Sequence, residues 1–310
     1  MGEGTDRKIE LKGAAILILA AAVYGSGLVA QKAGMDSLGP FAFSALRFLL
    51  GAAALVPLML IIEKRSTPEQ KAERLSGKPL VIGCFICAVD LVFMVASQQI
   101  GLPYTTVGKA GFITSLYVIL TPIAGVLFLK RKISHRVWVA AVMAVIGFYL
   151  LSLTGGMTSL NFGDGLMLIA AVSCTIYVYL MEYFSVKAEP VKFTMLQFLF
   201  TGGICAIFAI VFETTTMQDV INELAPILYA GLGICAIGYT LQMIGQKYVE
   251  SSRATILLSS ESLFSLFSGM IYYHELLSVR EYIGCALIFS AIILTEIKIN
   301  NKKDTENEQH

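Results

Sequence analysis

Charged residues are scarce in this chain. Asp, Glu, Lys and Arg together make up 15% of its 310 residues, whereas 56% are apolar and the mean hydropathy is +0.73. A soluble domain of this length needs a far larger charged fraction to cover its surface, so the composition indicates an integral membrane protein. The net charge of only +1 argues against a nucleic-acid partner.

Sequence motifs for catalysis, metal binding and nucleotide binding are also missing. His274 and Glu275 begin a string similar to HExxH, but position 278 is a serine and no second histidine follows, so this string is no zinc site. The chain has neither a GxSxG motif nor a Walker loop, which excludes an ATP-driven pump within this chain. No catalytic residue, metal ligand or cofactor is therefore expected, and the protein is not expected to be an enzyme.

Long apolar stretches are abundant instead. The hydrocarbon core of a bilayer is roughly 30 Å thick, and about 20 apolar residues cross it as a helix. Ten stretches meet this length, so the sequence predicts an all-α, multi-pass protein of the cell membrane with ten transmembrane helices. The stretches are 12–32, 41–62, 80–100, 106–129, 136–154, 164–185, 193–212, 225–246, 253–273 and 279–298.

The positions of Lys and Arg orient these helices. With the N-terminus inside, the cytoplasmic segments hold 19 of the 23 basic residues, whereas the outer loops hold Lys32 and Arg280. This distribution follows the positive-inside rule and predicts that both termini are cytoplasmic. The run after Arg7 is too long for a signal peptide and no cleavage site follows it, so it is interpreted as the first transmembrane helix. The basic residues on the cytoplasmic side are Arg7, Lys8, Lys12, Lys64, Arg65, Lys71, Arg74, Lys78, Lys130, Arg131, Lys132, Arg136, Lys187, Lys192, Lys247, Arg253, Lys298, Lys302 and Lys303.

The chain also contains an internal repeat. A shift of 144 residues aligns 104–153 with 248–297 without a gap, and the helix boundaries and a short Ser-x-Arg loop coincide. The sequence therefore divides into a first repeat at 12–154 and a second at 155–298, between a cytoplasmic segment 1–11 and a polar cytoplasmic tail 299–310. The aligned identities are Tyr104/Tyr248, Ala110/Ala254, Ser115/Ser259, Gly125/Gly269, Ser134/Ser278 and Arg136/Arg280.

Five helices per repeat is an odd number, so the second repeat must cross the membrane upside down relative to the first. Inverted repeats are common in secondary transporters, where the solute binds near the midplane between the two halves. An enzyme or a receptor has less need of this architecture. The repeat therefore favours a transporter of small solutes that works by alternating access.

Two of the ten helices carry almost no polar residues. They are 137–153 and 282–294, and we expect both to face lipid at the edge of the bundle. Small residues at a spacing of four in each, Ala140 with Ala144 and Ala286 with Ser290, let another helix approach closely and make a homodimer through these helices a hypothesis. The other eight helices are predicted to enclose a central cavity.

Four ionisable residues lie within the predicted membrane spans: Arg47, Asp90, Lys109 and Glu261. Each costs roughly 2.5–3.5 kcal/mol at mid-depth, so each needs a partner or a hydrated cavity. Glu182 is less telling because it lies near the cytoplasmic end of its helix. Opposite charges, amides and aromatic rings together suit a small zwitterionic or amide-bearing solute. The candidate residues for binding or coupling are Arg47, Asp90, Gln98, Lys109, Tyr117, Tyr177, Gln242 and Glu261.

Two other interpretations of the carboxylates stay open. Asp90 or Glu261 could form an ion pair with Arg47 or Lys109 that only holds the bundle together. Alternatively, a carboxyl group out of water can bind and release a proton near neutral pH, so Asp90 and Glu261 could couple transport to a proton gradient.

Three segments resemble one known family. They are QQIGLPYTTVGKAGFITSLYVILTP from Gln98 to Pro122, FSALRF around Arg47, and SSRATILLSSESLFSLFSGMIYYHELLSVREYIGCALI from Ser251 to Ile288. The chain is similar over about 12–298 to ten-helix members of the drug/metabolite transporter superfamily with two EamA-type domains. Leu266 and Cys174 depart from the pattern of many members, which have a proline-rich stretch and an aromatic residue there.

The resemblance implies a basket of inverted five-helix repeats with the fifth and tenth helices at the periphery. It also implies export or uptake of small metabolites such as amino acids, often with proton coupling or exchange. A sensor or ion pathway without transport is the main alternative, and a membrane-embedded enzyme is a weaker one.

Overall fold

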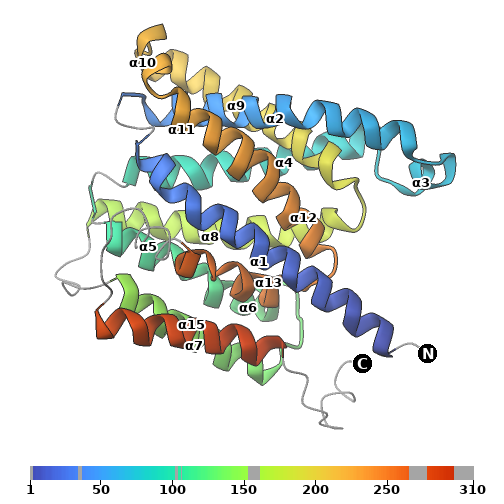
Figure 1. Ribbon diagram of the computed structural model, residues 1–310, viewed down its shortest axis with the longest axis vertical. Coiled ribbons are helices and arrows are strands. Elements are labelled where there is room, and N and C mark those ends of the chain that lie inside the picture. Colours follow the sequence, from blue (N-terminus) through green and yellow to red (C-terminus); the bar gives the residue numbers. More distant parts are fainter. Residues whose placement is uncertain are drawn as a thin grey trace.

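The computed structural model describes residues 3–33, 37–101, 104–105, 107–152, 161–264 and 278–296, and these residues contain helices and no strand. The helices lie side by side in one elongated bundle (Figure 1). Short helices α3 and α10 lie at opposite ends of the bundle. The elements are α1 (Glu3–Ala33), α2 (Pro40–Arg65), α3 (Pro68–Glu73), α4 (Gly77–Gly101), α5 (Val107–Ser115), α6 (Tyr117–Leu127), α7 (His135–Ser152), α8 (Phe162–Ser185), α9 (Pro190–Phe212), α10 (Met217–Asn222), α11 (Leu224–Leu228), the π-helix η2 (Tyr229–Tyr239), α12 (Thr240–Gln246), α13 (Ser251–Leu258) and α15 (Val279–Glu296).

Within the described ranges, six helical stretches are long and apolar enough to cross a membrane. Most of their side chains are apolar, as expected for helices that pack on neighbours with one face and meet lipid with the other. A seventh apolar helix, His135–Leu151, is shorter. The six stretches are Pro40–Arg65, Gly77–Gly101, Ala110–Leu127, Phe162–Ser185, Pro190–Phe212 and Leu224–Gln246.

Helices from the two halves of the chain pack against each other in pairs. α2 packs along α9, and α4 packs along α8. Glycines permit the close approach: a Cβ on Gly202 of α9 would lie 2.7 Å from Leu49 Cγ, and a Cβ on Gly101 of α4 would lie 3.1 Å from the carbonyl oxygen of Gly163. Small residues of this kind let membrane helices pack backbone to backbone.

Helices α7 and α15 pack on each other and lie together at the lower edge of the bundle in Figure 1, away from α2 and α9. Gly147 and Gly284 make the contact, because a Cβ on either would lie 2.8 Å from the other's carbonyl oxygen. Ala144 is fully buried. Ala286 and Ser290, the small pair predicted on α15, lie on its exposed face instead.

The helix predicted over 106–129 is interrupted. α5 ends at Ser115 and α6 begins at Tyr117, and a tight turn between them carries a bond from the Leu116 N–H to the Ile113 carbonyl. The hydroxyls of Thr114 and Ser115 donate to backbone carbonyls of their own helix, which bends helices. The interruption therefore precedes Pro122, which lies inside α6.

A second interruption occurs at the corresponding place in the other half. α13 ends at Leu258, a turn covers 259–260, and 261–264 are again helical. The hydroxyls of Ser259 and Ser260 donate back to the Ile256 and Leu257 carbonyls. Because Ser115 and Ser259 are equivalent in the repeat, Tyr117 and Glu261 are equivalent first residues after the two breaks.

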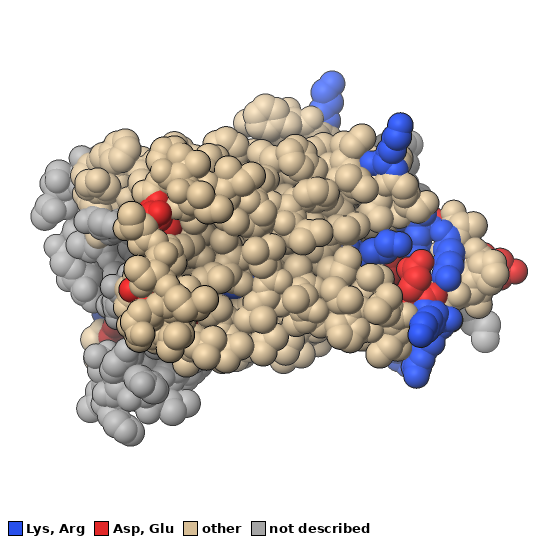
Figure 2. Space-filling model, turned by 90° about the horizontal axis from the view of Figure 1, so that it is seen from above, with Lys and Arg blue, Asp and Glu red and all other residues tan. Residues whose placement is uncertain are grey.

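Basic side chains gather at one end of the molecule, and uncharged residues cover most of its length (Figure 2). We call this the basic end. It comprises the end of α2, α3, the start of α4 and the loop between α6 and α7. Two acidic residues, Glu63 on α2 and Glu182 on α8, pair there with Lys192 and Arg131 at 3.6 Å and 2.9 Å.

Candidate functional site

Tyr239 lies at the centre of an aromatic cluster built by five different helices. Its ring contacts those of Tyr24, Phe48, Tyr177 and Phe198, with centroids 5.2–6.4 Å apart in edge-to-face geometry. Tyr239 is the last residue of η2, and such widened helical turns often occur at functional sites. Edge-to-face contacts hold these rings rigidly, so their hydroxyls point in fixed directions.

Two of these tyrosines are hydrogen-bonded to glutamine side chains. The Tyr24 hydroxyl donates to Gln242 Oε1 at 2.7 Å, and Gln197 Nε2 donates to the Tyr177 hydroxyl at 2.8 Å. Gln242 is 5% exposed and Gln197 is 1% exposed. Buried amides bonded to phenols form a polar lining inside an otherwise apolar bundle.

The two carboxylates of the predicted spans both interact with residues of α8. Asp90 on α4 is within hydrogen-bonding reach of Ser173, and Cys174 interacts electrostatically with both Asp90 and Glu261. Glu261 also interacts with the hydroxyls of Tyr24 and Tyr117. Tyr117 and Glu261, the first residues after the two helix breaks, therefore face the same interior region.

Arg47 is 4% exposed on α2, with its guanidinium 4.8 Å from the ring centre of Phe48 and 5.5 Å from that of Phe43. It acts electrostatically on Tyr239 and Cys235. No carboxylate among the described residues forms an ion pair with it. The hypothesis of an Arg47–Asp90 or Arg47–Glu261 brace thus has no support in the described part of the chain.

Several buried polar atoms in this region have no hydrogen-bond partner among the described residues. Each such atom costs about 1–3 kcal/mol if it stays unpaired, so it marks a place where a solute can bind. The atoms are Arg47 Nε, Asp90 Oδ2, Gln99 Nε2, Gln197 Oε1 and Thr240 Oγ1. Three of these atoms, on Arg47, Asp90 and Gln197, belong to a set of residues that we call the central site: Tyr24, Arg47, Asp90, Tyr117, Cys174, Tyr177, Gln197, Tyr239, Gln242 and Glu261.

Six of the eight predicted candidates belong to the central site. Gln98 is half-buried, and its neighbour Gln99 is the buried amide, accepting a hydrogen bond from Ser44 at 3.2 Å. The backbone of Lys109 belongs to α5, but its side chain lies outside the described part of the structure. Tyr24, Cys174, Gln197 and Tyr239 were not among the candidates, because a sequence pattern does not show which of many polar and aromatic residues meet.

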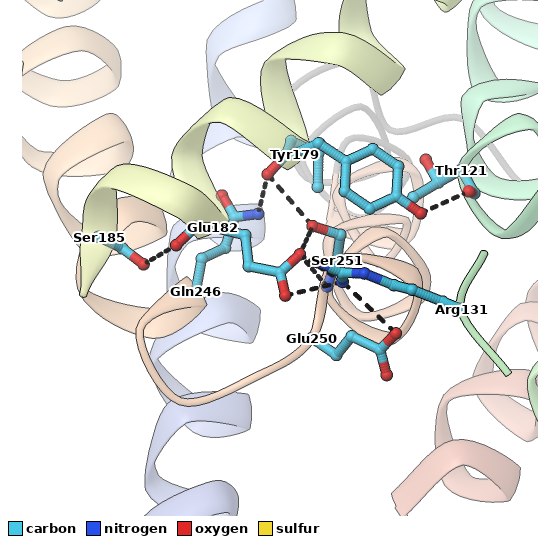
Figure 3. Close-up of polar contacts among 9 residues, drawn as sticks. Thr121, Arg131, Tyr179, Glu182, Ser185, Gln246, Glu250 and Ser251 are labelled. Atoms are coloured by element: carbon cyan, nitrogen blue, oxygen red, sulfur yellow. Dashed lines mark hydrogen bonds and ion pairs between the residues drawn. The ribbon is translucent and has the colours of Figure 1, made fainter. Parts of the chain in front are cut away.

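A second polar cluster joins α8 to the loop after α6 at the basic end (Figure 3). Arg131 Nη1 donates to both carboxylate oxygens of Glu182 at 2.9 Å and lies 3.6 Å from Glu250 Oε1. The Ser251 hydroxyl donates to Glu182, and Tyr179 donates to the Thr121 carbonyl at 2.7 Å. Glu182 therefore holds together three segments: its own α8, the loop after α6 and the start of α13.

Two groups of this cluster lie outside the membrane spans and have shifted pKa values. Burial raises the pKa of Glu250, and the nearby Glu182 carboxylate adds to the shift, while Arg131 and Arg253 oppose it. The hydrogen bond to Glu182 and the two carboxylates raise the pKa of Arg131 against the effect of its burial. Arg131 is therefore a permanent cation between two acidic groups.

The described residues contain no group of three or more His, Cys, Asp or Glu side chains that could hold a metal ion. The central site instead offers one unpaired cation, two carboxyl groups, amides and aromatic walls. Such a set can bind a small polar solute by charge and hydrogen bonding, and its carboxyl groups can exchange protons.

Comparisons with known proteins place the chain in a family. The EamA-like transporter family matches twice, over residues 11–153 and 161–297. A protein of Archaeoglobus fulgidus described as an uncharacterized transporter is 29% identical over 283 residues, covering 91% of this chain and 85% of the relative. The uncharacterized transporter YetK of Bacillus subtilis is 23% identical over 294 residues, covering 91% and 86%.

A solved crystal structure shares the fold, with a TM-score of 0.77 at 17% sequence identity. It covers 91% of this chain and 97% of the other. The double family match and the apolar helices agree with one another. The chain belongs to the EamA-like transporter family of the drug/metabolite transporter superfamily and is a multi-pass integral membrane protein.

Proposed function

We propose that the protein is a secondary-active transporter of small metabolites, such as amino acids or related compounds, that works by alternating access around the central site. The observation that carries this proposal is the group of buried, unpaired polar atoms on Arg47, Asp90 and Gln197, enclosed by helices from both halves of the chain. Both termini would be cytoplasmic and ten helices would cross the membrane as two inverted repeats, in agreement with the basic end in Figure 2.

The chemistry of the site favours a zwitterion. Arg47 has no carboxylate partner, so a solute carboxylate can bind its guanidinium. Asp90 and Glu261 offer negative charge to a solute amine, and the rings around Tyr239 offer walls for apolar atoms. An amide-bearing solute can bind Gln197 and Gln242 in the same way.

Proton coupling follows from the same carboxyl groups. Asp90 Oδ2 has no hydrogen-bond partner among the described residues, and Glu261 lies among tyrosine hydroxyls, so either can take up a proton when the solute leaves. The proposal expects accumulation of solute to collapse when an uncoupler abolishes the proton gradient. Glu261→Gln should lose gradient-driven accumulation while keeping exchange, and transport that ignores the gradient would contradict the coupling.

Counterflow in proteoliposomes tests the transport function itself. Vesicles that contain the purified protein are preloaded with one unlabelled metabolite, and the entry of its labelled form is followed across a metabolite panel. A transporter exchanges at least one solute faster than protein-free vesicles do. A sensor binds a solute and is stabilised by it, but exchanges none.

A further inference from the structure

The cluster at the basic end joins the first repeat to the second. Arg131 follows α6 in the first repeat. In the second repeat, Glu182 lies in the last turn of α8 and Ser251 is the first residue of α13. Arg131 Nη1 lies 2.9 Å from both Glu182 oxygens, and Ser251 bonds the same carboxylate through its hydroxyl. We call Arg131, Glu182 and Ser251 the latch.

The local sequence fixes the position of Arg131. Lys130 has a positive φ of 51°, and the Arg131 N–H donates to the Gly125 carbonyl at 2.9 Å, so the chain turns sharply back on α6. The guanidinium then lies 5.3 Å from the ring centre of Tyr179. A Cβ on Gly125 would lie 2.5 Å from the Tyr179 hydroxyl, so a larger residue would displace that ring.

A series of polar contacts connects the latch to the central site. Tyr24 donates to Gln242, Gln242 Nε2 donates to Gln246 Oε1 at 3.2 Å, and Gln246 Nε2 donates to the Val178 carbonyl at 3.0 Å. The Ser251 hydroxyl, whose one proton is donated to Glu182, lies 3.3 Å from that same carbonyl. Gln246 is 1% exposed, so water does not substitute readily for these bonds.

We propose that the latch closes the basic end of the central site, and that the contacts from Tyr24 through Gln242, Gln246 and the Val178 carbonyl to Ser251 make its closure depend on what the site holds. This inference rests on the proposed function. It adds a named closing device and a route by which the solute controls it.

The packing of the helices explains why the bundle can open at the latch. α2 with α9 and α4 with α8 are in contact along their lengths through glycines, so these pairs are expected to move together. The latch instead holds a loop and two helix ends by polar contacts, with Arg131 34% and Glu182 21% exposed at their side chains. Partly exposed ion pairs break at small cost, which suits a contact that must open in every cycle.

The native Cys174 provides a reporter inside the central site. It is half-buried and interacts electrostatically with Asp90 and Glu261, whereas Cys84, Cys87, Cys205 and Cys235 are buried and Cys285 lies on α15. The experiment measures alkylation of Cys174 by a bulky polar maleimide, quantified peptide by peptide with mass spectrometry, in protein held in lipid nanodiscs. Hydrogen exchange of the peptide around 248–258 is measured on the same samples.

Arg131→Gln and Glu182→Gln should each speed alkylation of Cys174 by about three- to tenfold, because loss of the latch raises the population of the open form. Hydrogen exchange of the peptide around 248–258 should rise together with the rate of alkylation. The double exchange Arg131→Glu with Glu182→Arg should restore most of the slow alkylation. Lys132→Gln is the matched control, since it removes an exposed positive charge from the next residue and should change neither rate.

Equal rates in wild type, Arg131→Gln and Glu182→Gln would overturn the proposal, and so would an equal rise in Lys132→Gln. If Arg131→Gln fails to fold, Ser251→Ala removes one hydroxyl of the latch and should shift both readouts in the same direction. Neither readout needs transport, so fast alkylation without counterflow would contradict the proposed function alone.

The connecting bonds have their own test. A solute found by its protection of Cys174 should change the exchange of 248–258 in the wild type. Gln246→Met keeps the volume of the side chain and removes its hydrogen bonds, so the solute should still bind while the change at 248–258 disappears. An unchanged response in Gln246→Met would show that the latch does not depend on these bonds.

Discussion

At the scale of single residues, the main feature is a buried positive charge in the interior that no described carboxylate pairs with. Arg47 is almost fully buried, contacts two phenylalanine rings, and has no carboxylate partner among the described residues. A buried cation without a counterion destabilises a protein, so its presence indicates a role in binding. Function and stability are therefore expected to oppose each other at this position.

Arg47→Met tests this opposition. The substitution removes the buried charge and keeps an apolar side chain of similar length, so the protein should unfold at a temperature at least as high as the wild type. It should also lose protection of Cys174 by any carboxylate-bearing solute. Arg65→Met, at the exposed end of the same helix, is the control for a lost positive charge and should keep the protection.

Glu182 and Glu250 both meet Arg131, but they are expected to affect stability in opposite directions. Glu182 receives two hydrogen bonds at 2.9 Å, so Glu182→Gln should lower the unfolding temperature. The pKa of Glu250 is raised, chiefly by burial, so its ionisation costs folding free energy as the pH rises above the unfolded value of about 4.3.

Glu250→Gln removes the cost of that ionisation. Its free energy of unfolding should therefore exceed that of the wild type at pH 7 to 8. The difference should be less than about 1 kcal/mol, because the Glu250 side chain is 43% exposed. The two should converge as the pH falls towards 4, where Glu250 is protonated in both states. A constant difference over this pH range would show that burial of the carboxylate is not the cause.

At the scale of helices, adjacent glycines of α9 give a matched pair. A Cβ on Gly202 would lie 2.7 Å from Leu49 Cγ, whereas a Cβ on Gly203 would meet nothing within 4 Å. Gly202→Ala should lower the free energy of unfolding by about 1–3 kcal/mol through overpacking. Gly203→Ala should raise it by about 0.5–1 kcal/mol through helix propensity. Thermal unfolding in detergent measures both, and equal effects would contradict the packing of α2 on α9.

The sequence predicted much of the helical arrangement and less of its interior. Hydropathy and the repeat indicated which segments become helices, and the low polarity of 137–153 and 282–294 matches the pairing of α7 with α15 at one edge of the bundle. The breaks at Ser115 and Ser259 depend on side-chain bonds to backbone carbonyls, which hydropathy does not record. The equivalence of these two serines in the repeat was the available signal.

At the scale of the whole molecule, segments far apart in sequence build the central site. Tyr24 and Gln242 are separated by 218 residues yet share a hydrogen bond, and Arg131 meets Glu182 across the boundary between the repeats. A sequence shows that such groups are polar and within apolar helices, but not which of them meet. The proposed inverted arrangement of the two halves would let the two ends of one site open in turn.

Orientation is testable at this scale. The basic end should be cytoplasmic, so a green fluorescent protein fused after His310 should fluoresce, and alkaline phosphatase fused there should be inactive. A phosphatase fusion in the loop between α1 and α2 should be active. The reverse pattern would contradict the orientation and place the latch on the outer side.

The most direct test of the central claim is counterflow in proteoliposomes, run with wild type and Arg47→Met across a panel of small metabolites. The account predicts that at least one zwitterionic or amide-bearing metabolite exchanges across the wild-type vesicles. The same metabolite should slow alkylation of Cys174, and its exchange should fall at least tenfold in Arg47→Met, about 1.4 kcal/mol of lost binding. A metabolite that protects Cys174 and stabilises the protein but never exchanges would contradict it.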